Sequence, residues 1–267
     1  MSDVATITET HFITNDVTGR EFLKQLEPYP CYGGLDLSNT SDLTAFVLVW
    51  HIGETIYCYP WFFLPSEGLV ERSKHDGVPY DQWLKEGYLE MTPGWTVDDR
   101  YVVSRITELG KSFKIKEIAF DQWGAKDVVS HLAEHNVDCV QISQQLGAMT
   151  APSKRLERLV LDKHLVHTGH PLLRWNLDCT TIYSDVNGNI KPVKPALKKS
   201  SKRIDGIIAL VMAISRVQQA KPQFKSIYSS RGVLTVDVTG CLSCNLIRRS
   251  RNDPKALCPL HAKAKAG

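Results

Sequence analysis

The chain has 267 residues, of which 43% are hydrophobic and 23% are charged. This composition is typical of a folded globular protein and excludes a largely disordered or fibrous chain. No apolar run approaches the roughly 20 residues that a membrane-spanning helix needs, so we expect no membrane insertion. Residues 1–27 have neither the basic nor the apolar part of a secretory signal.

The charge of the chain is unevenly distributed. The formal net charge is +3, but residues 191–203 carry +6 and residues 240–267 carry +5, so the remaining residues total −8. Basic segments on an otherwise acidic body favour a polyanionic partner, although solvated lysine-rich loops are the more common explanation of any single charge run. Four of the seven cysteines stand singly in apolar stretches, which favours buried thiols in a reducing compartment over disulfides.

The first part of the chain predicts a linker followed by three strands. Residues 1–30 are polar and weakly periodic, and we expect them to form an N-terminal linker. The apolar and β-branched stretches 31–38, 43–52 and 55–64 are separated by short turns, so they predict an antiparallel meander.

After residue 65 the pattern changes to alternating helices and strands. Apolar residues recur at helical spacing, and Pro152 is expected near the first turn of one helix. We expect helices over 67–75, 80–85, 97–113, 127–134, 152–165 and 204–217, and strands over 116–121 and 137–142. The sequence therefore predicts an α/β domain with a mixed sheet over residues 31–236, followed by a basic tail over residues 237–267.

Three aspartates lie in apolar surroundings. Asp36 lies in or at the end of the first strand, Asp121 ends a later strand, and Asp205 opens the last helix. A buried carboxylate needs a compensating cation, which Lys or Arg side chains or bound metal ions would supply. For each aspartate alone, capping of a backbone amide is the simpler interpretation.

The chain resembles a known family through several stretches in sequential order. They are Gly33–Ser38, Asp76–Trp83, Leu89–Pro93, Ala119–Asp121, Pro171–Trp175 and Arg203–Gly206. Together they resemble the nuclease portion of tailed-phage terminase large subunits. The resemblance implies a ribonuclease H-like mixed sheet flanked by helices.

The resemblance also implies a chemistry. It assigns Asp36, Asp121 and Asp205 as catalytic ligands of two Mg²⁺ or Mn²⁺ ions, with Asp42 as an auxiliary acid. The expected activity is metal-dependent endonucleolytic cutting of concatemeric double-stranded DNA to genome length. The expected partners are double-stranded DNA, a portal protein, a small terminase subunit and a separate ATPase half. The expected location is the cytoplasm of the infected bacterial host, at the procapsid portal.

The ATPase motor of the full family is expected to be missing from this chain. About 30 residues precede the nuclease-like portion, which is too few for a domain. Gly110-Lys111-Ser112 resembles the end of a phosphate-binding loop, but position 105 is Arg rather than Gly.

The basic segment before Asp205 is rich in Pro and Ser, which predicts a mobile loop. Lys and Arg contacts to phosphates supply most non-specific DNA affinity, so we expect this loop to hold DNA against the metal site. The candidate DNA-binding residues are Lys191, Lys194, Lys198, Lys199, Lys202 and Arg203.

The tail carries a second candidate metal site. Cys241 and Cys244 are paired at CxxC spacing, and Cys258 and His261 follow at CxxH spacing. This spacing predicts a closed, structural Cys₃His zinc site and a small zinc-knuckle-like module, with a tail lacking metal as the alternative. His131 and His135 also stand four residues apart on a predicted helix, but a solvent-facing pair is the simpler interpretation.

Two other functions stay open at this point. One is another ribonuclease H-like nuclease of the resolvase or transposase type. The other is a non-catalytic DNA-binding or portal-docking module whose acids are structural.

Overall fold

The computed structural model describes residues 19–38, 43–121, 125–195 and 201–219. The chain divides into two units, Met1–Ala220 and Lys221–Gly267, and all described residues belong to the first. No helix in the described ranges is both long and apolar enough to cross a membrane.

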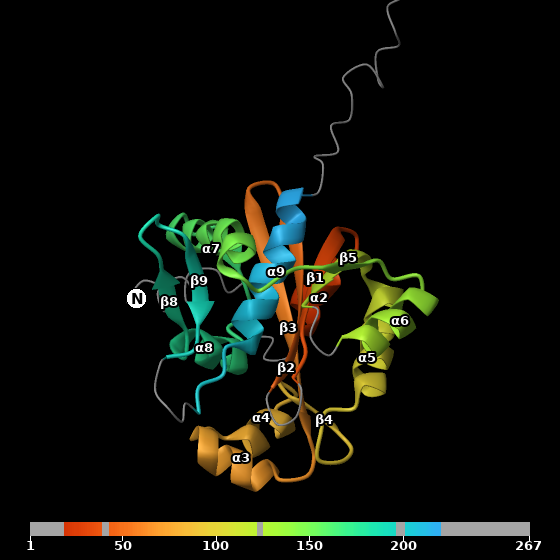
Figure 1. The fold of residues 1–267 in the computed structure, drawn as a ribbon. Coiled ribbons are helices and arrows are strands. Elements are labelled where there is room, and N and C mark those ends of the chain that lie inside the picture. The colour runs from red at the N-terminus through yellow and green to blue at the C-terminus, as the bar shows by residue number, and fades with distance from the viewer. Residues whose placement is uncertain (1–18, 39–42, 122–124, 196–200, 220–267) are drawn as a thin grey trace, which may run out of the picture. The chain divides into compact units, whose positions relative to one another are not determined.

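Within the described residues the strands form one seven-stranded mixed sheet and a separate two-stranded sheet (Figure 1). The large sheet has the order β4-β3-β2-β1-β5-β6, with β7 also paired to β3. Its strands are β1 (Pro30–Asp36), β2 (Thr44–Ile52), β3 (Thr55–Pro65), β4 (Glu90–Thr92), β5 (Lys114–Phe120), β6 (Cys139–Gln141) and β7 (Leu165–Val166). The small sheet pairs β8 (Thr181–Ser184) with β9 (Ile190–Val193).

The first three strands form the antiparallel meander that the sequence predicts, and β5 then pairs with β1 in parallel. β6 is also parallel to β5, and β4 and β7 are parallel to β3. This mixture confirms the predicted α/β architecture with a central mixed sheet.

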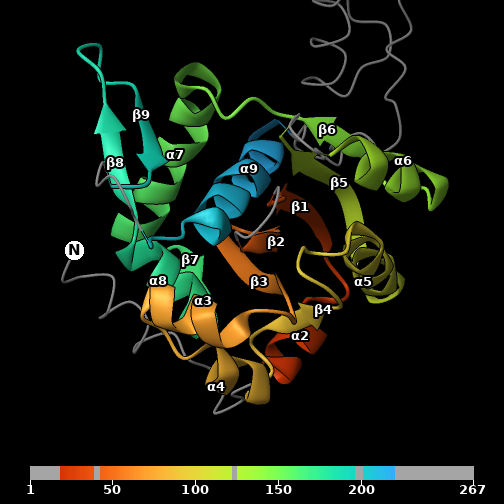
Figure 2. The ribbon, with the colours of Figure 1, turned by 60° about the horizontal axis from the view of Figure 1, so that its bottom comes forward.

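Helices cover both faces of the sheet (Figure 2). They are α2 (Arg20–Leu26), α3 (Leu69–Asp76), α4 (Tyr80–Lys85), α5 (Asp99–Ser112), α6 (Lys126–Glu134), α7 (Leu146–Leu161), α8 (Pro171–Asp178) and α9 (Asp205–Gln219). α9 packs with α7 and α8 on one face, whereas α5 and α6 pack on the other.

Strand β2 shows why the sheet lies between two helical layers. Ala45, Val47 and Val49 belong to the core shared with α9, whereas Phe46 and Leu48 belong to the core shared with α5. Successive side chains of a strand point to opposite faces, so a continuous apolar run requires cover on both sides.

Three predictions about local structure were wrong. Residues 20–26 form α2 inside the expected linker, because Leu26 is buried against the core beside α5. Residues 190–193 form β9 rather than part of a mobile loop, because they pair with β8. α7 begins at Leu146, so Pro152 lies inside the helix, where it is buried, and not in its first turn.

Candidate active site

The topology places Asp36 and Asp121 at one edge of the sheet. Leu35 of β1 is paired in parallel with Phe120 of β5, and the next residue in each case is the aspartate: Asp36 ends β1, and Asp121 directly follows β5. Because parallel strands run in the same direction, both carboxylates leave the sheet at its same edge. Burial of β1 and β5 in the centre of the sheet fixes these two positions.

Helix α9 brings the third aspartate to this edge. A Cβ atom built on Gly34 would lie 1.9 Å from the carbonyl oxygen of Ala209, so only glycine allows α9 to pack this closely on β1. Asn176 of α8 accepts a hydrogen bond from the Gly206 backbone N–H through its Oδ1 at 2.7 Å, which satisfies a free donor at the start of α9. These contacts fix Asp205 at the first position of the helix.

The three aspartates interact electrostatically. The pKa of Asp36 lies well above its usual value, chiefly because burial removes water from the carboxylate and because Asp205 adds a negative charge nearby. Asp121 raises the same pKa further. A hydrogen bond from Gln144 and the positive charge of Lys194 act in the opposite direction.

Asp205 has an unsatisfied oxygen. Its residue is 8% exposed, and no described residue forms a hydrogen bond with its Oδ2 atom. Burial raises the pKa of this carboxyl group, Lys194 and Arg203 lower it, and Asp76 raises it. A buried anionic oxygen without a partner is costly, so this atom fits a cationic ligand.

The donor set matches a hard divalent cation, since such ions prefer carboxylate oxygens. The described residues do not enclose an ion by themselves: none of their Asp, Glu, His and Cys side chains form a group of three that could hold a metal. Asp42 lies outside the described residues, and so do the zinc candidates Cys241, Cys244, Cys258 and His261.

Gln144 is a site residue that sequence reasoning missed. Its Nε2 donates to Asp36 Oδ1 at 2.9 Å, and its backbone carbonyl accepts a hydrogen bond from Lys191 Nζ at 3.3 Å. Gln144 precedes α7 in a polar stretch that has no motif, so the sequence offers no signal for this contact.

The predicted DNA-binding residues fall into three groups. Lys191 and Lys194 lie on or just after β9: Lys194 acts electrostatically on Asp36 and Asp205, and Lys191 donates to the backbone carbonyl of Gln144. Lys198 and Lys199 lie outside the described residues. The two candidates shortly before α9 differ from each other: Lys202 is exposed, whereas Arg203 is only 9% exposed and forms a salt bridge with Asp76.

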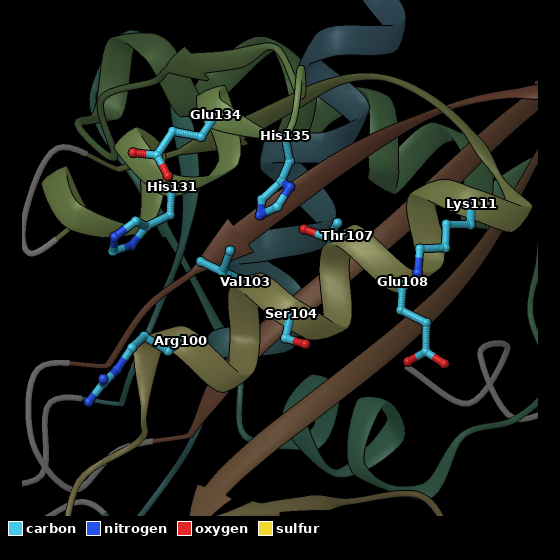
Figure 3. Close-up of a pocket in the computed structure, with 9 residues that line it drawn as sticks. All are labelled: Arg100, Val103, Ser104, Thr107, Glu108, Lys111, His131, Glu134 and His135. Atoms are coloured by element: carbon cyan, nitrogen blue, oxygen red, sulfur yellow. The ribbon is translucent and has the colours of Figure 1, made fainter.

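The histidine pair lies apart from the aspartates. His131 and His135 line a pocket between α5 and α6, on the other face of the sheet from α9 (Figure 3). Figure 3 shows the two imidazole rings directed to different parts of this pocket, with Thr107 nearer to His135. His135 is exposed, whereas His131 is half-buried.

Comparisons with known proteins agree with this architecture. A family model described as "Terminase large subunit, endonuclease domain" matches residues 24–221. The large terminase subunit of Enterobacteria phage HK97 is 34% identical over 192 residues, which cover 70% of this chain and 37% of that protein. Protein YmfN of Escherichia coli (strain K12) is 28% identical over 203 residues, covering 73% of this chain and 44% of its own length.

A solved structure supports the same assignment. The crystal structure of the HK97 bacteriophage large terminase matches with a TM-score of 0.66 at 32% identity, covering 78% of this chain and 43% of that one. The fold, with three aspartates at one edge of its sheet, thus places the protein in the class of large-terminase α/β domains. The chain belongs to the terminase large subunit endonuclease domain family, as its sequence predicts. It spans less than half the length of either curated relative.

Proposed function

We propose that this chain is a divalent-metal-dependent endodeoxyribonuclease domain of a phage DNA-packaging terminase, with a ribonuclease H-like fold. The observation that carries the proposal is the buried, unpartnered Oδ2 of Asp205 at the sheet edge where β1 and β5 deliver Asp36 and Asp121. Family membership supports the reaction class.

The three aspartates would together hold the metal ions, because the charges of Asp205 and Asp121 both act on the carboxylate of Asp36. Two Mg²⁺ or Mn²⁺ ions would activate a water and stabilise the leaving 3′-oxygen of a phosphodiester. Gln144 would hold the Asp36 carboxylate in one orientation through its hydrogen bond.

The lysines beside the site would hold the DNA backbone. Lys194 acts on Asp36 and Asp205, and Lys191 binds the backbone of Gln144, which itself binds Asp36. A phosphate held by these ammonium groups would therefore lie next to the site. Lys198, Lys199 and Lys202 belong to the same basic segment and would extend this contact. Phosphate contacts carry no sequence information, so we expect them to support cutting at any sequence.

The biological setting follows from the family as a proposal. The enzyme would cut concatemeric double-stranded DNA to genome length in the cytoplasm of the infected host, at the portal of the procapsid. An ATPase half, a small terminase subunit and the portal protein would be its partners. The tail's zinc site stays a prediction.

Cleavage of supercoiled plasmid tests the proposal directly. We expect cutting with Mg²⁺ or Mn²⁺, none with chelator, and no requirement for ATP. Asp36→Asn, Asp121→Asn and Asp205→Asn should each lower the rate by about 100-fold or more, because each removes a ligand charge.

Asp162→Asn is the matched control, since Asp162 is an exposed aspartate at the end of α7. Cleavage within about tenfold of wild type in an aspartate variant would remove that residue from the site. No cleavage by the wild type with any divalent ion would favour the non-catalytic docking module. Cutting restricted to branched DNA would favour a resolvase-type nuclease.

A further inference from the structure

Asp76 is the centre of a buried polar network next to the candidate active site. Its side chain is 1% exposed, although it lies at the end of α3, far in sequence from the three aspartates. Tyr80 donates its hydroxyl to Asp76 Oδ2 at 2.8 Å, and His75 Nδ1 lies 2.7 Å from Oδ1. Both carboxylate oxygens therefore have partners.

The principal partner of Asp76 is Arg203. The guanidinium donates through Nε to Oδ2 at 3.0 Å and through Nη2 to Oδ1 at 3.3 Å. This two-pronged arrangement is the strongest geometry that an Arg–carboxylate pair adopts. The side chain of Arg203 is 11% exposed, so the pair is largely shielded from water.

Arg203 stands two residues before Asp205, and its charge acts on the Asp205 carboxylate. The charge of Asp205 also acts on Arg203, so a guanidinium released from Asp76 would be drawn to the unsatisfied Oδ2 of Asp205. Such a pair would occupy the oxygen that a metal ion needs. Engagement of two of its donors by Asp76 removes that competition.

We propose that Asp76 is a positioning residue that binds the Arg203 guanidinium and thereby keeps the Asp205 carboxylate available to a divalent cation. The inference rests on the proposed metal-dependent function. It also accounts for the burial of Arg203, a residue of the basic segment. Tyr80 assists by holding the Asp76 carboxylate in the orientation that Arg203 uses.

The test is Mn²⁺ binding to the full chain, measured by calorimetry without DNA. Asp76→Asn should weaken Mn²⁺ binding about tenfold or more, because the released guanidinium competes for Asp205. Adding Arg203→Gln to Asp76→Asn should restore the affinity to within about threefold of wild type, because the competing cation is gone. A merely structural pair would show no such rescue.

Glu117→Gln is the matched control. Glu117 of β5 is ion-paired with Arg216 in the last turn of α9, the helix that begins at Asp205. Glu117→Gln therefore removes an ion pair of α9 that lies outside the proposed network. Its Mn²⁺ affinity should equal that of wild type.

Wild-type affinity in Asp76→Asn, or a double variant as weak as the single one, would overturn the inference while leaving the proposed function intact. Absence of Mn²⁺ binding by the wild type would overturn the proposed function and the inference with it. If Asp76→Asn does not fold, Tyr80→Phe replaces it. We then expect a loss of about two- to threefold that Arg203→Gln again removes, and no loss would overturn the inference.

Discussion

At the scale of single residues, the site combines charge burial with incomplete hydrogen bonding. Asp205 is nearly buried, and its Oδ2 has no hydrogen-bond partner among the described residues. Asp36 is close enough to repel it. Both features cost free energy in the metal-free protein, which is typical of a site built for a ligand rather than for stability.

Asp205→Asn should therefore stabilise the metal-free protein. The change removes a buried negative charge and its repulsion from Asp36, so the free energy of unfolding in chelator should rise by about 1–3 kcal/mol. The same change should abolish stabilisation by added Mg²⁺, because it weakens the ligand set. Chemical denaturation with chelator and with Mg²⁺ measures both effects. A lower stability in chelator would show that the Asp205 carboxylate is already satisfied in the folded protein.

The proposed role of Asp76 in binding Arg203 could not be predicted from the sequence. Asp76 and Arg203 are 127 residues apart in sequence, and an aspartate near a helix end is ordinarily a surface or capping residue. Only the fold brings the two charges together, and burial makes their pairing obligatory.

At the scale of helices and strands, the close packing of α9 on β1 positions the site. The carbonyl of Ala209 and the backbone N of Ala213 occupy the space where a side chain on Gly34 would lie. The helix reaches the sheet edge at Asp205 only because β1 offers this flat surface.

Gly34→Ala should consequently destabilise the protein by about 1–3 kcal/mol, since the added methyl group forces α9 away from β1. Displacement of α9 would also lower Mg²⁺-dependent cleavage. The control is Gly110→Ala in α5, where no atom lies within 4 Å of the new Cβ and helix propensity favours alanine. Thermal unfolding of both variants provides the comparison. Equal stability of Gly34→Ala and wild type would mean that the close approach does not determine the position of α9.

Most secondary structure was predictable because the core elements are apolar at a clear period. The runs over 43–52 and 55–64 and the helical spacing over 204–217 correspond closely to β2, β3 and α9. The β8–β9 hairpin was missed because β8 is exposed along its whole length and has no apolar alternation. The early start of α7 was missed because Pro152 normally begins or interrupts a helix, whereas here its burial in the core compensates.

At the scale of the described unit, two histidines make stability depend on pH. His170 packs against the rings of Tyr59, Phe62 and Tyr88. Burial lowers the pKa of His170 to about 3, and the pKa of His167 falls to about 4 through burial and the nearby Arg174. Both imidazoles are therefore neutral in the folded protein at physiological pH.

The direction of the pH effect follows from these pKa values. The unfolded chain binds protons at these histidines near pH 6.5, whereas the folded protein resists protonation until about pH 4. Their contribution to stability is thus fully present above pH 6.5 and is lost as the pH falls toward 4. Lowering the pH from 7.5 to 5 should cost about 2 kcal/mol per histidine.

His170→Phe should reduce the loss of stability between pH 7.5 and pH 5 by about 2 kcal/mol, because phenylalanine fills the same aromatic site and does not titrate. Unfolding by urea at pH 7.5 and pH 5 measures the difference. An unaltered pH dependence in His170→Phe would show that this histidine is not buried as a neutral group.

The central claim is that the sheet edge carrying Asp36, Asp121 and Asp205 binds divalent cations for phosphodiester hydrolysis. Anomalous diffraction from a crystal soaked in Mn²⁺ tests it most directly, because manganese is located without assumption about its ligands. We predict an anomalous peak in contact with the carboxylates of Asp36 and Asp205, and its loss in Asp205→Asn. A crystal with no peak at this edge, or with manganese bound only elsewhere, would contradict the claim.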